Sequence, residues 1–331
     1  MRRCRDGFAL TISFGLLLFI PCLVFGEEPG NITIKFPGLI YLVHPDKKDP
    51  LGSGTMTLDP NTKVWNQVYE DFDQFARVSP DGRLIAMNLF LKGAGPVGLH
   101  VIDFSGKKPP VRISETPRTG VVAWSADGKE ILTAGLSPPR VYKYQRVGID
   151  GTVKQKLPIA ETARVFDWSP NGQWLAYVDL QKPERPVKIV HANGTGERLI
   201  LASTDPIPEF GGTIGFRPRF SPDGHKLLFD TILFEKKNNV PVKAKRTSLL
   251  LADIETGKVE EILVRREKDL AFGACWSPDG KMLAVVVDEG EAKGVGEPRK
   301  SHVAIVSLEG EVLRSIPMPE ANFARNVFEW R

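Results

Sequence analysis

Four charged residues occupy the same place in a short motif that recurs along this chain. Each lies two positions before the serine of a Trp/Phe-Ser-Pro-Asp-Gly pattern, or before the residue that replaces this serine. Residues at one repeat position are expected to form one layer, and buried charges generally need partners of opposite sign. We therefore predict two ion pairs between neighbouring repeats, Arg77 with Glu329 and Asp167 with Arg219, within the roughly 6 Å range of direct coupling. Ala123 and Cys275 complete the layer. We consider two interpretations of the layer. Its charges either pair only to stabilise the fold, without a ligand, or form part of a binding site.

A second set of residues is basic and lies where the later repeats are longer than the first ones. Residues 235–246, 288–300 and 205–212 are predicted as long loops on one face, where recognition by a rigid scaffold usually takes place. The alternative is a solvated, mobile loop without a specific role. The predicted partner-binding residues are Lys236, Lys237, Lys243, Lys245, Arg246, Arg299 and Lys300.

Other patterns that could support chemistry are weak. Residues 93–98 match Gly-x-Gly-x-x-Gly, but a strand is expected after them, whereas a dinucleotide site needs a helix. The motif aspartates are spread over separate repeats, where they cap their own turns, and the five histidines form no close pair. Cys275 is expected in a buried strand as an inert thiol. We predict no catalytic residue, no cofactor and no metal site; a metal held by several repeats around a central axis is the alternative.

The motif itself indicates how these residues are positioned. Proline presets the turn, Asp or Asn caps it, and glycine adopts the positive φ that closes a hairpin. An apolar strand follows the motif, then a third strand with a polar end and a short fourth strand. Four strands in each period of 44 to 56 residues are typical of a propeller blade. The copies begin at Val78, Trp124, Trp168, Phe220 and Trp276, and a truncated copy begins at Trp330.

The two ends of the chain are predicted to share the sixth blade. Residues 326–330 resemble a first strand, and residues 32–36, 39–43 and 55–58 are expected to supply the other three. A blade split in this way closes the ring and removes exposed sheet edges. The predicted fold is all-β, a six-bladed β-propeller with four antiparallel strands per blade.

On these motifs the chain resembles the WD-repeat-like, TolB-type propeller family and the propellers of prolyl oligopeptidases. The resemblance covers nearly the whole chain after residue 26. It implies a propeller fold, whereas these turns are structural and recur in proteins with unrelated roles. TolB itself is not expected, because only a few residues separate the N-terminal apolar run from the first predicted strand. A hydrolase is not expected either, since no Gly-x-Ser-x-Gly motif occurs.

The N-terminus has the pattern of a signal peptide. Arg2, Arg3 and Arg5 precede an apolar run, and cleavage is expected near Gly26, with an uncleaved anchor as the alternative. The domains are therefore predicted as residues 1–26, the signal peptide, and residues 27–331, one propeller. The formal charge of +4 falls to about +2 without the signal, which gives no indication of nucleic-acid binding.

These observations predict an exported, periplasmic or extracellular, interaction module that binds a protein or another envelope component. We expect a monomer with no transmembrane segment after signal cleavage. The alternative is a propeller enzyme or carbohydrate-binding protein with its site at the axial channel.

Overall fold

The structure, a computed structural model, describes a large part of the chain, and the expected signal peptide lies outside that part. The unit Phe36–Arg331 contains every strand of the described residues. No helical segment in the described part has the length and apolarity that a membrane crossing requires. The described residues are 35–45, 53–69, 76–91, 95–105, 108–114, 119–137, 141–159, 163–179, 186–201, 213–237, 240–266, 270–289, 300–318 and 326–331.

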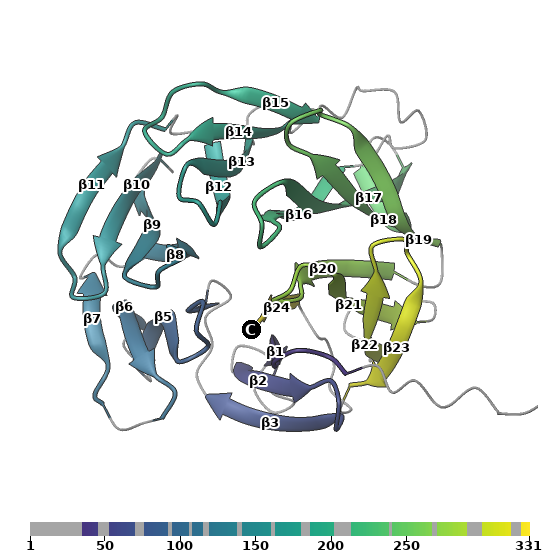
Figure 1. Cartoon of the computed structure of the whole chain (residues 1–331), viewed down its shortest axis with the longest axis horizontal. Coiled ribbons are helices and arrows are strands. Elements are labelled where there is room, and N and C mark those ends of the chain that lie inside the picture. The colour runs from purple at the N-terminus through teal and green to yellow at the C-terminus, as the bar shows by residue number, and fades with distance from the viewer. Residues whose placement is uncertain are drawn as a thin grey trace, which may run out of the picture. The chain divides into compact units, whose positions relative to one another are not determined.

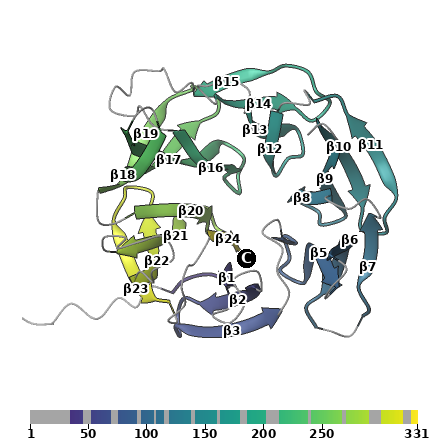
Figure 2. The same ribbon diagram turned by 180° about the vertical axis from the view of Figure 1, so that it is seen from behind.

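Six four-stranded antiparallel sheets surround a central axis in this unit (Figures 1 and 2). This confirms the predicted six-bladed β-propeller. Blade 1 contains β4 (Arg77–Val78), β5 (Leu84–Leu91), β6 (Gly95–Asp103) and β7 (Val111–Ser114); blade 2 contains β8 (Thr119–Trp124), β9 (Glu130–Ser137), β10 (Val141–Gly148) and β11 (Val153–Leu157). Blade 3 contains β12 (Ala163–Trp168), β13 (Trp174–Asp179), β14 (Val187–His191) and β15 (Arg198–Leu201); blade 4 contains β16 (Thr213–Phe220), β17 (Lys226–Lys237), β18 (Val240–Asp253) and β19 (Val259–Arg266). Blade 5 contains β20 (Leu270–Trp276), β21 (Met282–Glu289), β22 (Lys300–Ser307) and β23 (Val312–Pro317); blade 6 contains β24 (Asn326–Trp330), β1 (Ile40–Pro45), β2 (Ser53–Asp59) and β3 (Val64–Tyr69).

The motif forms the turn between the first and second strands of a blade. In blade 5 the Ser277 hydroxyl donates to Asp279 at 2.6 Å and accepts the backbone N–H of Met282 at 2.9 Å. The same pair of bonds occurs in blades 1 to 4. The Ser79 hydroxyl that donates to Asp81 holds the pKa of this carboxyl below its usual range. The motif carboxylates therefore act as turn caps.

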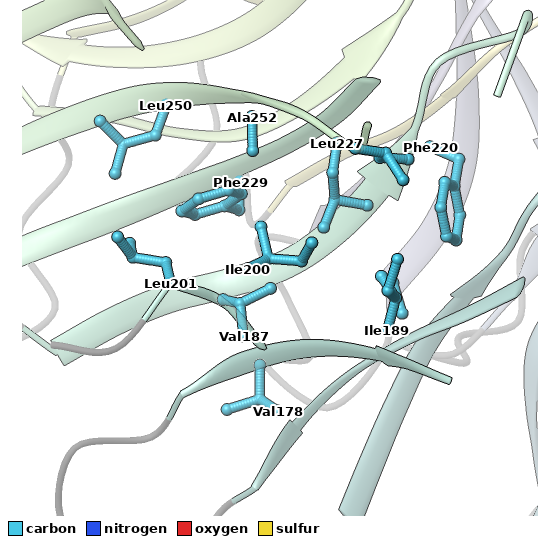
Figure 3. Close-up of a cluster of buried hydrophobic side chains, with 12 residues drawn as sticks. Val178, Val187, Ile189, Ile200, Leu201, Phe220, Leu227, Phe229, Leu250 and Ala252 are labelled. Carbon is cyan, nitrogen blue, oxygen red and sulfur yellow. The ribbon is translucent and has the colours of Figure 1, made fainter. Parts of the chain in front are cut away.

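Hydrophobic contacts between blades form the core. Between blades 3 and 4, side chains from β13 to β15 pack against Phe220, Leu227 and Phe229 (Figure 3). Where their side chains are described, the second strands of blades 1, 3, 4 and 5 are buried on both faces, as their near-continuous apolar sequences indicate. The rigid contacts between neighbouring blades hold the first strands around the axis.

Blade 6 is closed by both ends of the unit, but one predicted strand is wrong. β24 pairs with β1, Ile40 opposite Trp330, and Leu39 and Arg331 exchange two backbone hydrogen bonds at 2.6 and 2.9 Å. The fourth strand is β3 and not residues 32–36. Residues 32–34 lie outside the described residues, whereas Lys35 and Phe36 are described and belong to no strand. The Asn61 side chain binds both backbone polar groups of Phe36 at 2.8 Å.

Candidate axial site

The four predicted charged residues lie on the first strands of four blades and come together at the axis. Arg77 Nε lies 3.9 Å from Glu329 Oε1, and Arg219 Nη1 lies 3.8 Å from Asp167 Oδ1. Arg219 Nη1 is also 3.7 Å from Glu329 Oε1, so the two expected pairs join into one network. We call these four residues the axial charged layer. Its role as a site stays a prediction.

Glu329 is the centre of this network, and Arg331 is a member that the sequence did not single out. Arg331 Nη2 lies 2.9 Å from Glu329 Oε2, and the Glu329 side chain is only 9% exposed. Three guanidinium groups, those of Arg77, Arg219 and Arg331, thus surround two carboxylates. Arg331 occupies the position of the motif serine, and this position in the repeat indicates that the residue lies near the axis.

Burial dominates the electrostatics of Asp167. Desolvation raises the pKa of its carboxyl, although Arg219 and the Phe220 N–H, which donates to Oδ2 at 2.8 Å, favour the charged form. Burial likewise raises the pKa of the Cys275 thiol, which therefore stays protonated and unreactive at neutral pH.

The raised pKa of Asp167 predicts a distinct pH dependence of stability. Because its folded-state pKa lies above the ordinary value of 3.8, the folded protein binds a proton before the unfolded chain does. The contribution of this group to the free energy of unfolding should rise as pH falls from neutrality through the folded-state pKa. Urea unfolding of wild type and Asp167→Asn over this range should show wild type gaining stability relative to the variant on acidification. A difference that is constant with pH, or that changes in the opposite direction, would refute the assignment.

Motif tryptophans fix the layer by bonds between blades. Trp124 Nε1 donates to the Arg77 carbonyl at 2.9 Å, and Trp276 Nε1 donates to the Arg219 carbonyl at 3.2 Å. In each case the acceptor belongs to the axial residue of the preceding blade. The backbone of both arginines is thereby held in place, so their side chains approach the axis from defined positions.

A pocket of about 190 Å³ opens beside this layer at the end of the ring where the motif turns lie. This volume far exceeds the roughly 10–15 Å³ that a cavity needs to hold one water, so a small chemical group fits. Charged groups, tryptophans and turn prolines line it together. They include Asp167, Arg219, Glu329, Arg331, Trp124, Trp168, Trp276, Pro80, Pro170 and Pro222.

The prediction that residues 235–246 of blade 4 form a loop is wrong. Lys236 and Lys237 end β17, while Lys243, Lys245 and Arg246 lie in β18, and the two strands pair up to Lys237 opposite Val240. The lysine-rich composition indicated a loop because lysine is depleted in strands.

The remaining predicted basic residues lie in blade 5. Lys300 begins β22, opposite Glu289. Arg299 and residues 205–212 lie outside the described residues. Partner binding by this set stays a prediction.

Three of the described histidine side chains have local partners. His191 stacks on Trp174 with ring centroids 3.7 Å apart, and His302 Nδ1 lies 3.3 Å from Glu289 Oε1. His100 Nδ1 lies 2.9 Å from the Gly98 carbonyl oxygen. Within the described ranges no three His, Cys, Asp or Glu residues form a group that could hold a metal ion.

The fold and the repeat define the chain as a TolB-like β-propeller, which confirms the resemblance at the level of the fold. TolB from Acinetobacter baumannii superposes with a TM-score of 0.64 and 17% identity, over 87% of this chain and 65% of the TolB chain. A putative TolB from Agrobacterium tumefaciens gives a TM-score of 0.52 and 19% identity over 73% and 87% of the two chains.

Oligogalacturonate lyase from Vibrio parahaemolyticus gives a TM-score of 0.51 and 13% identity, over 85% of this chain and 79% of the lyase. Sequence identities this low show a similar fold but not a shared role. This chain spans about two thirds of the length of the A. baumannii TolB chain. No protein-family model and no curated protein matches the sequence.

Proposed function

We propose that this chain is an exported interaction module of the periplasm or cell envelope that binds its partner at the axial pocket. The supporting observation is the pocket's lining, which combines paired charges with tryptophan and proline side chains. Aromatic residues and arginine are the residue types enriched where proteins bind other proteins. The TolB-like fold is compatible with this role.

The pocket can recognise a partner segment in two ways. Arg219 and Arg331 offer guanidinium donors to a carboxylate or carbonyl, and the turn prolines and tryptophans offer apolar walls. Because the layer is held by bonds between blades, it needs little reorganisation on binding. A single domain of residues 27–331 is part of the proposal.

The experiment uses the exported protein with a photoreactive amino acid at Ala126, an exposed residue of the pocket lining. Wild-type chain expressed in a Gram-negative host should appear in the periplasm with a mass that corresponds to cleavage near Gly26. Irradiation should crosslink the Ala126 position to a defined envelope protein. The matched control carries the same amino acid at Val153, an exposed residue of β11 on the outer side of blade 2.

Either of two results would overturn the proposal. A full-length product retained in the cytoplasm excludes export, and equal crosslinking at Ala126 and Val153 excludes a partner at the pocket. If oligosaccharides instead raise the melting temperature and protect Ala126 from crosslinking, the pocket serves carbohydrate binding, because a ligand of the folded state must stabilise it. Tryptophans beside charged groups in the lining favour that second candidate.

A further inference from the structure

The motif turns of neighbouring blades pack against one another at five of the six junctions in the ring. At each of these five junctions, a motif residue of one blade lies 3.5 to 3.8 Å from the Cβ position of a glycine with positive φ in the next blade. The pairs are Pro80 with Gly128, Pro170 with Gly224, Pro222 with Gly280, Pro278 with Gly38, and Arg331 with Gly82. Four junctions are therefore filled by the ring of a motif proline.

The junction between blades 2 and 3 lacks this proline, because Ala126 occupies the motif position. Apart from the chain neighbours of Gly172, the only described atoms within 4 Å of its Cβ position are two of the Trp168 ring. Ala126 is exposed, and both Ala126 and Trp168 line the axial pocket. The pocket therefore includes a junction that is open where the others hold a motif residue.

The indole N–H of Trp168 is a second indication that this junction lacks a group. Trp168 is only 6% exposed, yet among the described residues its Nε1 has no hydrogen-bond partner. The matching N–H groups of Trp124 and Trp276 donate to carbonyls of the preceding blade. Trp168 Nε1 instead lies 3.9 Å from the Cβ position of Gly172, at the open junction. Because a buried donor without an acceptor is unfavourable, a ligand that brings an acceptor to this junction is favoured.

The charges in the same pocket favour an acidic group in the ligand. Arg331 lines the pocket, and its side chain is 31% exposed. Its Nη2 pairs with Glu329, whereas its buried Nε has no hydrogen-bond partner among the described residues. Together with Arg77 and Arg219, it gives the network three guanidinium groups for two carboxylates. A carboxylate of the ligand would balance this charge and accept guanidinium N–H bonds.

We propose that the axial pocket binds a peptide segment with a proline and a neighbouring acidic residue, and that the proline ring fills the junction between blades 2 and 3 beside Trp168. The motif prolines at the equivalent junctions are the model for this contact. A proline-rich segment forms a polyproline II helix without internal hydrogen bonds, so its carbonyls are free to accept the indole N–H. Aromatic-lined grooves bind such preformed helices at a low entropic cost. The inference rests on the proposed function and names the chemistry of its partner.

The experiment measures the fluorescence anisotropy of a labelled ten-residue peptide of alternating glutamate and proline in the presence of the full chain. This peptide should bind about tenfold or more tightly than two matched peptides, one with glutamine for each glutamate and one with alanine for each proline. Ala126→Pro should weaken binding about tenfold or more, because the chain's own ring then fills the junction. Its melting temperature should equal or exceed that of wild type, since four other motif turns accommodate a proline.

Two further variants separate the open junction from the rest of the ring. Trp168→Phe keeps an aromatic ring and removes the unpaired N–H, so it should weaken peptide binding about 5-fold, the equivalent of one hydrogen bond. Pro278→Ala is the matched control, because it opens a junction whose proline is not among the residues that line the pocket. It should lower the melting temperature and leave the peptide affinity unchanged.

Equal binding of the three peptides to wild type, or unchanged binding to Ala126→Pro, would overturn the proposal. These outcomes are distinguishable from a failure of the proposed function. If the Ala126 position crosslinks to an envelope protein but the glutamate-proline peptide does not bind, only the proline site is wrong. If the peptide binds but the position crosslinks to no envelope protein, only the role as an envelope interaction module is wrong.

Discussion

Gly38→Ala should lower the free energy of unfolding by about 3 kcal/mol or more, the larger part of it through a backbone clash. Gly38 has a φ of +60°, and a Cβ at this position would lie 2.1 Å from the carbonyl oxygen of Arg331. The same oxygen accepts the Leu39 N–H in the closure of blade 6. The variant must therefore open these hydrogen bonds, each with a net contribution of about 1 kcal/mol, in addition to the cost of a left-handed alanine.

Gly257→Ala is the matched control for this prediction. Gly257 has a φ of +71°, but no atom lies within 4 Å of the Cβ position. It should thus show only the cost of the left-handed conformation, about 1 kcal/mol. Calorimetric melting of both variants measures the difference. Equal melting temperatures would show that the backbone at Gly38 moves freely and that the closure does not depend on this close approach.

Glu329→Gln should destabilise the propeller by about 3 kcal/mol or more, because it leaves buried arginines without their shared carboxylate. Glu329 lies within 4.0 Å of guanidinium nitrogens of Arg77, Arg219 and Arg331. Glutamine has nearly the same shape, so the lost charge and not a cavity determines the effect. Urea unfolding measures the change in the free energy of unfolding from the shift of the transition midpoint, when the slope of free energy against urea concentration is the same for both proteins.

Two controls define the outcome for Glu329. Glu309→Gln alters an exposed carboxylate and should change stability by less than about 0.5 kcal/mol. Asp167→Asn should cost less than Glu329→Gln, because asparagine still accepts the Phe220 N–H and the carboxylate it replaces is strongly desolvated. If Glu329→Gln lowers the free energy of unfolding no more than Glu309→Gln does, the ion pairs of the axial charged layer do not stabilise the fold.

The repeat made most of the fold and the axial charged layer predictable. A fixed motif position implies a fixed position in space, so the sequence alone predicts the pairing of Asp167 with Arg219, and the turn bonds of Ser277 follow from the motif's chemistry. Prediction failed where the repeat is interrupted. Residues 32–36 alternate between apolar and polar side chains, whereas Val64–Tyr69 does not, so alternation favoured the wrong segment. The pairing of β24 with β1 and of β2 with β3 shows which strand completes blade 6.

The sequence did not indicate the pocket or the strands over residues 235–246 of blade 4, for different physical reasons. The pocket depends on tryptophans and prolines from several blades, whose motif roles in turns and packing conceal a shared surface. The lysine-rich composition of residues 235–246 indicates a loop, whereas the structure pairs them as strands, because a strand's register is fixed by its partner rather than by its own residues. For the pocket, the missing information lies in contacts between distant segments.

The shared blade also determines when folding can finish. Ile40 and Trp330 must meet before blade 6 exists, and bringing such distant residues together has a large entropic cost that slows folding. During synthesis, blades 1 to 5 can form from local hairpins, but the ring stays open until residues 326–330 have been made. A chain that must cross a membrane before it folds would gain time from this order of events, since its closure waits for its last strand.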